Sequence, residues 1–192
     1  MNKSLIIATA GHTDHGKTQL IQRITGVNTD QLPEEQKRGI TINLGYAYKT
    51  FQNGNTIGFI DVPGHRQFIK NMLAGLAGID TALLVVAADN GLMQQTLEHI
   101  SILNLLGFKK CLVAITKIDL VDKNQTSAIS KEIKKLLSNT SMSDAEIFQL
   151  SSKSGRGLGK LTEALSTLSE KQVKKEINGN FRLPIDRVFS KK

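Results

Sequence analysis

GHTDHGKT, the stretch from Gly11 to Thr18, decides the fold of this chain. It matches the P-loop pattern Gly-x4-Gly-Lys-Thr, follows the apolar run LIIATA and opens the helical pattern KTQLIQRIT. Gly11 and Gly16 let the backbone bend closely, so that the amides of the loop converge on phosphate at a helix N-terminus. Lys17 then places a charge between the β- and γ-phosphates, and the hydroxyl of Thr18 is a ligand for Mg2+. The stretch therefore predicts a loop that binds nucleotide phosphates.

Two histidines and an aspartate in the same stretch raise the alternative of a metal site. Zinc needs three or four ligands that converge on one point. A loop wrapped around phosphate instead points its amides inward and its side chains outward, so we interpret His12 and His15 as packing or hydrogen-bonding residues. The residues expected to surround the nucleotide are His12, Thr13, Asp14, His15, Gly16, Lys17 and Thr18.

Apolar runs alternate with helical patterns along the rest of the chain. The runs Thr81–Ala88 and Cys111–Thr116 are continuously apolar, which is typical of strands covered by helices on both faces. YAYKTF and TIGFIDV flank Asn53-Gly54-Asn55, a hairpin signal, because asparagine and glycine tolerate positive φ. We predict an α/β fold with a mostly parallel central sheet, one antiparallel edge hairpin and helices on both faces. Ligands should bind at the carboxyl ends of the strands.

The composition limits the classes of protein to which the chain can belong. A net charge of +8 suggests acidic partners, with nucleic acid first among them, although lysines such as Lys131 and Lys134 each also suit a solvated helix face. Cys111 is the only cysteine, which excludes a disulfide framework, indicates a reducing compartment and fits a buried structural position. No apolar run is long enough to cross a membrane, so no membrane partner is expected.

The length suits one domain and the start of another. Residues 1–170 hold all the motifs and are expected to form the nucleotide-binding domain. Residues 171–180 are polar and charged, as in a linker, and FRLPIDRVF then starts like a new strand. Because a lone strand cannot bury itself, residues 181–192 are expected to be the first strand of a truncated second domain.

Two further motifs suit the phosphate and magnesium end of such a site. Asp61-Val62-Pro63-Gly64 stands at a strand end, where Asp61 can hold magnesium through water and the Gly64 amide can reach a γ-phosphate. Thr41 lies in TDQLPEEQKRGITINLG, a charged stretch that is too polar for the core and is expected to be irregular. Its hydroxyl would bind magnesium only when a γ-phosphate is present, and the alternative is a β-branched residue that enters a strand. The metal ligands expected are Thr18, Thr41 and Asp61.

The motif Thr116-Lys117-Ile118-Asp119 ends the strand CLVAIT and resembles the guanine-reading motif of GTPases. Guanine offers an N1–H and a 2-amino group to one carboxylate, and adenine offers neither donor, so Asp119 would select guanine. The stem of Lys117 can cover the base. The alternative is a surface lysine beside a helix-capping aspartate. Ser151-Ser152-Lys153 resembles the loop whose backbone amide meets guanine O6, with Ser152 in place of the commoner alanine.

Seven stretches together resemble the translational GTPases of the elongation factor Tu family and cover most of residues 5–120: GHTDHGKT, RGITIN, DVPGH, KNMLAG, LLVVAADNG, QQTLEHI and TKIDL. Within that family, LPEEQKRGITINLGYAY, GFIDVPGH and the threonine of TKID are more similar to the selenocysteine-specific elongation factors than to elongation factor Tu. The resemblance implies a P-loop GTPase fold, GTP hydrolysis, GTP or GDP with Mg2+ as cofactors, and a β-barrel second domain. It also implies a monomer in the cytoplasm whose partners are the ribosome, selenocysteinyl-tRNA and, through C-terminal domains, an mRNA hairpin.

The resemblance also assigns roles to single residues. His65, which follows Gly64, would position the water that attacks the γ-phosphate, and Asp14 would help to organise a monovalent cation. Thr13 stands where valine is usual, and its polar side chain would loosen an apolar gate beside this histidine, while Gln19 replaces a small hydroxyl residue. Three alternatives stay open: another translational GTPase of the elongation factor Tu or initiation factor kind, a metabolic P-loop ATPase or nucleotide kinase, and a module that holds GTP without hydrolysing it.

Overall fold

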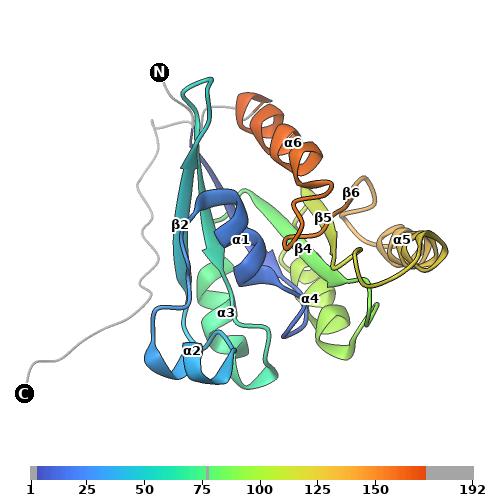
Figure 1. Ribbon diagram of the computed structural model, residues 1–192, viewed down its shortest axis with the longest axis horizontal. Coiled ribbons are helices and arrows are strands. Elements are labelled where there is room, and N and C mark those ends of the chain that lie inside the picture. The colour runs from blue at the N-terminus through green and yellow to red at the C-terminus, as the bar shows by residue number, and fades with distance from the viewer. Residues whose placement is uncertain (1–3, 77, 172–192) are drawn as a thin grey trace, which may run out of the picture.

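The computed structural model describes residues 4–76 and 78–171 and is built around a six-stranded sheet (Figure 1). The strands are β1 (Ser4–Ala10), β2 (Gly45–Thr50), β3 (Thr56–Asp61), β4 (Thr81–Ala87), β5 (Cys111–Thr116) and β6 (Glu146–Gln149). In space they lie in the order β2-β3-β1-β4-β5-β6. All neighbours are parallel except β2 and β3, which pair antiparallel as the hairpin signal predicted. The predicted fold class is confirmed.

Helices cover both faces of this sheet (Figure 1). On one face, α1 (Lys17–Thr25) and α6 (Leu158–Lys171) bury leucine and isoleucine side chains against the strands. On the other face, α3 (Ile69–Leu76), α4 (Gln94–Leu105) and α5 (Lys123–Leu137) do the same. β4 and β5 are buried along their whole length, as expected for the two continuously apolar runs. The two faces thus form two apolar layers that fix where each strand ends.

A short helix, α2 (Pro33–Arg38), stands in the charged stretch that was expected to be irregular. That expectation was wrong because local capping determines the conformation here. Pro33 occupies the first helical position, where its fixed φ suits a helix and its missing N–H costs nothing. The side chain of Glu35 accepts from the N–H of Leu32 at the start of the helix. Gly39 ends the helix with a φ of 68°.

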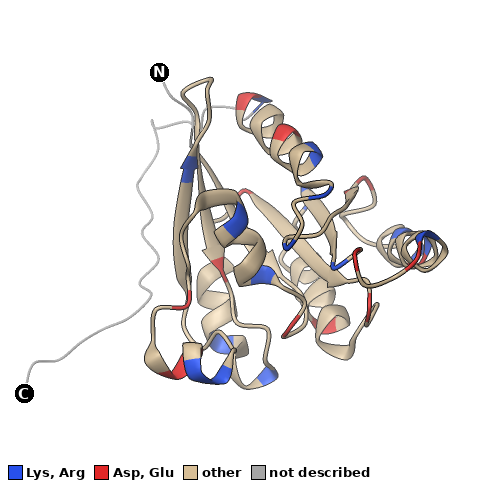
Figure 2. Cartoon of the chain, viewed as in Figure 1, with Lys and Arg blue, Asp and Glu red and all other residues tan. Residues whose placement is uncertain are grey.

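Basic residues are spread over α1, α2, α5 and α6, and acidic residues lie among them (Figure 2). Residues 172–192 contain six lysines and arginines and two acidic residues, so half of the net charge of +8 belongs to them. These residues lie outside the part that the structure describes, and so do the strand predicted for 181–192 and the linker from 172 on. Within the described ranges, no helix has both the length and the apolar character needed to cross a membrane.

Candidate functional site

The P-loop joins β1 to α1 through three residues with positive φ: Gly11 (131°), Asp14 (63°) and Gly16 (84°). At Gly11 the neighbouring strand β4 leaves no room for a side chain, because a Cβ would lie 2.2 Å from the carbonyl oxygen of Val85. Glycine is therefore required at the start of the loop both for its conformation and for space. Asp14 adopts the left-handed conformation that aspartate tolerates better than most residues. The chain thus turns sharply at the carboxyl end of β1, the edge where a ligand was expected.

Two side chains of α4 support the P-loop. His99 is 1% exposed, and its Nδ1 accepts from the N–H of Gly11 at 2.9 Å. Burial lowers the pKa of His99 to about 3, so the imidazole is neutral and keeps a lone pair for this bond. Gln95 accepts through Oε1 from the N–H of Thr13 at 3.1 Å and from its hydroxyl at 3.3 Å. Neither α4 residue was predicted to take part in the site, although both belong to the stretch QQTLEHI.

The two loop histidines pack against each other and against β4. Their ring centroids are 5.1 Å apart, in an edge-to-face arrangement. His15 is fully buried, with Nδ1 3.4 Å from the carbonyl oxygen of Val85. Burial also lowers the pKa of His15 to about 4, so this ring is neutral at physiological pH. The packing of His12 and His15 agrees with their interpretation as structural residues of the loop.

Lys17 turns its ammonium group back toward the P-loop. Nζ donates to the carbonyl oxygens of Gly11 at 3.1 Å and His12 at 2.9 Å. Burial lowers the pKa of Lys17 to about 8, although three nearby carboxylates act to raise it. Gly64 packs on the same group, because a Cβ there would lie 2.6 Å from Nζ of Lys17 and 2.7 Å from the nitrogen of Thr13. The DVPG motif therefore meets the P-loop where the sequence predicted a γ-phosphate.

Oxygen atoms suited to magnesium gather beside the loop. The hydroxyls of Thr18 and Thr41 are hydrogen-bonded to each other at 3.1 Å, and Thr41 also donates to Oδ1 of Asp30 at 2.8 Å. An octahedral Mg2+ with ligands at about 2.1 Å places adjacent ligands about 3 Å apart. The two hydroxyls therefore fit neighbouring positions around such an ion, and hard oxygen atoms are the ligands that Mg2+ prefers.

Asp61, the last residue of β3, is a fully buried carboxylate. Its Oδ1 accepts from the hydroxyl of Thr9 at 2.9 Å and its Oδ2 from the hydroxyl of Thr29 at 2.6 Å. Two hydroxyl donors fix the orientation of the carboxylate, which suits a group that holds a metal-bound water. Thr9, Thr29 and Asp30 were not predicted to belong to the site, since nothing in the sequence pattern indicates partners so far along the chain.

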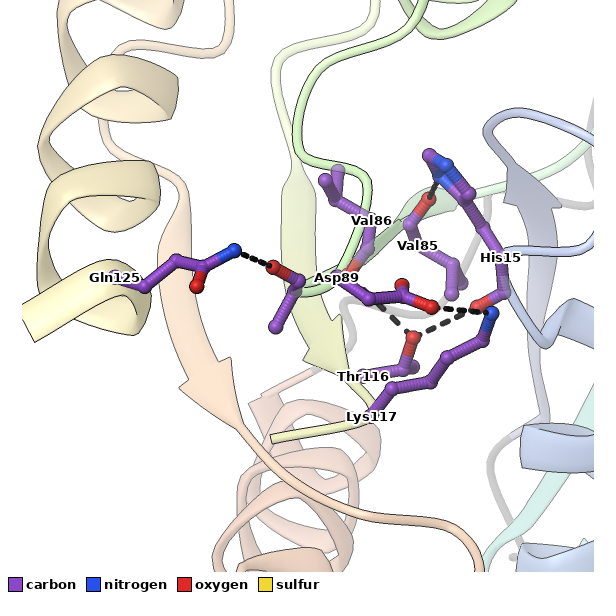
Figure 3. A network of polar contacts seen from close by, with 8 residues as sticks. His15, Val85, Val86, Asp89, Thr116, Lys117 and Gln125 are labelled. Atoms are coloured by element: carbon purple, nitrogen blue, oxygen red, sulfur yellow. Dashed lines mark hydrogen bonds and ion pairs between the residues drawn. The ribbon is translucent and has the colours of Figure 1, made fainter. Parts of the chain in front are cut away.

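The predicted guanine motif is tied to the P-loop by its threonine (Figure 3). The hydroxyl of Thr116 donates to the carbonyl oxygen of His15 at 2.7 Å and lies 3.4 Å from that of Val86. Lys117 follows with a positive φ of 56°, and its Nζ pairs with Oδ2 of Asp89 at 3.2 Å. Gln125 donates from α5 to the carbonyl oxygen of Ala88, which holds the end of β4 in the same network (Figure 3).

Asp119 is exposed, so its carboxylate is accessible to a base. A hydrogen bond from Ser151 and one from its own backbone hold the pKa of Asp119 below its usual range, so the group is ionised at neutral pH. The N–H of Ile118 lies 3.4 Å from the carbonyl oxygen of Leu150, which brings the TKID and SSK segments side by side. In the SSK segment Ser152 is buried and Lys153 is exposed.

His65 lies at the surface, directly after Gly64. Its Nδ1 accepts from the N–H of Gln67 at 3.2 Å and so caps η1 (Arg66–Phe68), a short 3-10 helix. Its ring centroid is 6.1 Å from that of Phe68. Because Nδ1 is used by this bond, Nε2 is the ring nitrogen that remains for a ligand.

A cavity of about 220 Å³ connects the P-loop and Gly64 with Asp30, Thr41 and Lys117. The P-loop, the oxygen atoms suited to magnesium and the TKID motif with its exposed carboxylate all lie at one edge of one sheet. Together they define the class of P-loop domains that bind a guanine nucleotide.

Residues 2–171 match the elongation factor Tu GTP binding domain, and the chain belongs to this family of translational GTPase domains. It is 51% identical over 188 residues to the selenocysteine-specific elongation factor of Escherichia coli (strain K12) and 47% identical to that of Desulfomicrobium baculatum. Each of these comparisons covers 98% of this chain and 30% of the relative. Translation initiation factor 2 subunit gamma of Thermococcus onnurineus is 36% identical, over 83% of this chain and 44% of the relative.

Solved structures agree with these relatives. A bacterial selenocysteine-specific elongation factor, EF-Sec, superposes with a TM-score of 0.85 at 38% identity, covering 90% of this chain and 30% of that one. The factor SelB of Methanococcus maripaludis, in complex with the GTP analogue GppNHp, gives a TM-score of 0.80 at 27% identity, covering 93% and 37%. The resemblance predicted from the motifs is confirmed, and the initiation factor alternative is not favoured. The chain spans about 30% of the length of the bacterial relatives named here.

Proposed function

We propose that this chain is the GTP-binding and GTP-hydrolysing domain of a selenocysteine-specific elongation factor, which delivers selenocysteinyl-tRNA to the ribosome in the cytoplasm. The observation that carries the proposal is that four motifs far apart in the sequence lie at one edge of the sheet. They are the P-loop, the DVPG motif, the TKID motif and the SSK segment. The degree of similarity supports the narrower assignment, since three relatives that are 46–51% identical share that description. Contacts with the ribosome, the tRNA and an mRNA hairpin are proposed to involve also those parts of such factors that this chain does not cover.

The nucleotide is assigned to the site motif by motif. The P-loop residues His12 to Thr18 surround the phosphates, which the ammonium group of Lys17 and the loop amides other than that of Thr13 hold. Thr116 to Asp119 and the segment Ser151–Lys153 hold the base, with Asp119 as the group that selects guanine. Bound Mg2+ would neutralise the phosphate charge, with Thr18 and Thr41 as ligands and Asp61 acting through water. Asp14 is proposed as the residue beside a monovalent cation.

Hydrolysis requires a water in line with the bond between the β- and γ-phosphates. Lys17 and the loop amides are fixed in place before the reaction, so they stabilise the charge that develops without reorganisation. His65 adjoins Gly64, the residue that packs on Lys17, and its Nε2 is proposed to orient the water. Thr13 stands where valine is usual and directs its hydroxyl to Gln95 at 3.3 Å, and this polar group is proposed to loosen the apolar gate beside His65.

Replacement of His65 tests the assignment of a catalytic role. In His65→Ala we expect single-turnover GTP hydrolysis, measured with Mg2+ and with ribosomes added or omitted, to fall by about 100-fold or more, because a water-orienting group is lost. The dissociation constant for GTP should stay within about twofold of wild type, since this side chain holds no phosphate or base. Gln67→Ala is the matched control, because Gln67 contacts His65 only through its backbone N–H. Equal hydrolysis rates for His65→Ala and wild type would reject the role and leave GTP binding intact.

A further inference from the structure

The segment Gly39–Leu44 contains Thr41 and belongs to no helix or strand. Its backbone groups must therefore find partners outside a regular ladder. The carboxylate of Glu35 supplies two of them, because Oε1 accepts from the N–H of Ile42 at 2.9 Å and from that of Asn43 at 3.0 Å. Its Oε2 accepts from the N–H of Leu32 at 2.9 Å, so one side chain joins the start of α2 to the residues after Thr41.

Burial makes these bonds hard to replace with water. Glu35 is 2% exposed, and a carboxylate removed from water is costly unless hydrogen bonds compensate. Burial acts to raise the pKa of Glu35, but hydrogen bonds from four backbone N–H groups outweigh it and lower the pKa below its usual range. The carboxylate is thus charged, and both of its oxygen atoms accept hydrogen bonds from backbone N–H groups. Its neighbour Glu34 is exposed and pairs with Arg38 at 2.9 Å across one helical turn.

Helix α3 holds the same segment from the other side. Nδ2 of Asn71 donates to the carbonyl oxygen of Ile42 at 2.9 Å, so both backbone groups of Ile42 are bound by side chains. Leu44 packs closely on Gly75, where a Cβ would lie 2.7 Å from its Cδ2. The residue before Ile42 is Thr41, whose hydroxyl contacts Thr18.

We propose that Glu35 is a positioning residue that holds Thr41 against the P-loop, so that the magnesium ligand is in place when a γ-phosphate is bound. The inference rests on the proposed function, in which Thr41 binds magnesium only in the triphosphate state. It adds a residue that acts on Thr41 through the backbone, by accepting from the N–H groups of Ile42 and Asn43. Because GDP does not use Thr41, Glu35 should favour GTP over GDP rather than support both equally.

The test compares the dissociation constants for GppNHp and GDP, both with Mg2+, in three variants of the chain. Glu35→Gln keeps the size of the side chain, but its amide NH2 must face one of the N–H groups that the carboxylate accepts from. We expect binding of GppNHp to weaken about tenfold, because a hydrogen bond from a backbone N–H to the carboxylate is replaced by a contact between two donors. Binding of GDP should change less than about twofold. Glu34→Gln, the matched control, should change neither constant. Thr41→Ala should reproduce the selective loss.

The ratio of the two constants is the readout, because partial unfolding removes binding of both nucleotides equally and leaves the ratio unchanged. Trypsin cleavage after Arg38 in the GppNHp complex gives a second readout, which we expect to be faster in Glu35→Gln than in Glu34→Gln. A wild-type ratio in Glu35→Gln with a lowered ratio in Thr41→Ala would overturn the role of Glu35 alone. Wild-type ratios in both variants would overturn the magnesium role of Thr41 as well.

Discussion

At the scale of single residues, the site was predictable where a residue's own chemistry identifies it. Lys17 and Asp119 carry the charge that a phosphate and a guanine require, and the motif spacing marks both. Gln95 and His99 were not predicted, because their role depends on contacts with Thr13 and Gly11 that span more than 80 residues of chain. An amide and an imidazole inside an amphipathic helix carry no signal of such contacts.

The burial of His99 leads us to predict how the free energy of unfolding changes with pH. Its pKa in the folded state, about 3, lies below the unfolded value of about 6.5, so its contribution to stability is complete above pH 6.5 and is lost as the pH falls toward 3. The loss amounts to about 1.4 kcal/mol per pH unit for one proton. In His99→Gln, which keeps an acceptor for Gly11, denaturant unfolding from pH 6.5 to 4.5 should show a slope smaller by about that amount. Parallel stability curves for the two proteins would contradict a neutral, buried His99.

At the scale of helices and strands, prediction succeeded where burial sets the pattern. β4 and β5 are buried on both faces, and their continuous apolar runs indicate this directly. The helix α2 was missed because it is six residues long and depends on capping by Pro33, Glu35 and Gly39 rather than on an apolar stripe. The charged stretch was judged too polar for the core, yet Glu35 and Thr41 are buried there because their polar atoms are hydrogen-bonded.

The junction of β1 with the P-loop gives a prediction at this scale. Gly11→Ala places a Cβ 2.2 Å from the backbone of β4, which cannot move aside without disturbing the sheet. We expect the free energy of unfolding to fall by about 2–3 kcal/mol, from overpacking and strained φ together. Gly159→Ala is the control with the opposite sign, because a Cβ in α6 meets nothing within 4 Å and alanine favours the helix by up to about 1 kcal/mol. Similar unfolding midpoints for the two variants would contradict the close approach at Gly11.

At the scale of the whole molecule, the order and direction of the strands bring the residues of the candidate site together. The P-loop follows β1, the DVPG motif begins at the end of β3 and the TKID motif begins at the end of β5. These three strands run parallel, so the motifs lie at the same edge of the sheet. The sequence predicted this edge, since parallel strands point their carboxyl ends the same way. The net positive charge is less informative about partners, because half of it belongs to residues 172–192 and the other basic residues are spread over helices, strands and loops (Figure 2).

The choice of nucleotide tests the whole arrangement most directly. Dissociation constants for GTP, ATP and xanthosine triphosphate should be measured with Mg2+ on the chain, on Asp119→Asn and on Asp122→Asn, whose aspartate caps α5 instead. We expect the chain and Asp122→Asn to bind GTP at least about 100-fold tighter than ATP, because ATP leaves a carboxylate without its two donors. Asp119→Asn should prefer xanthosine triphosphate. Equal affinities for GTP and ATP, or an unchanged preference in Asp119→Asn, would contradict the site described here.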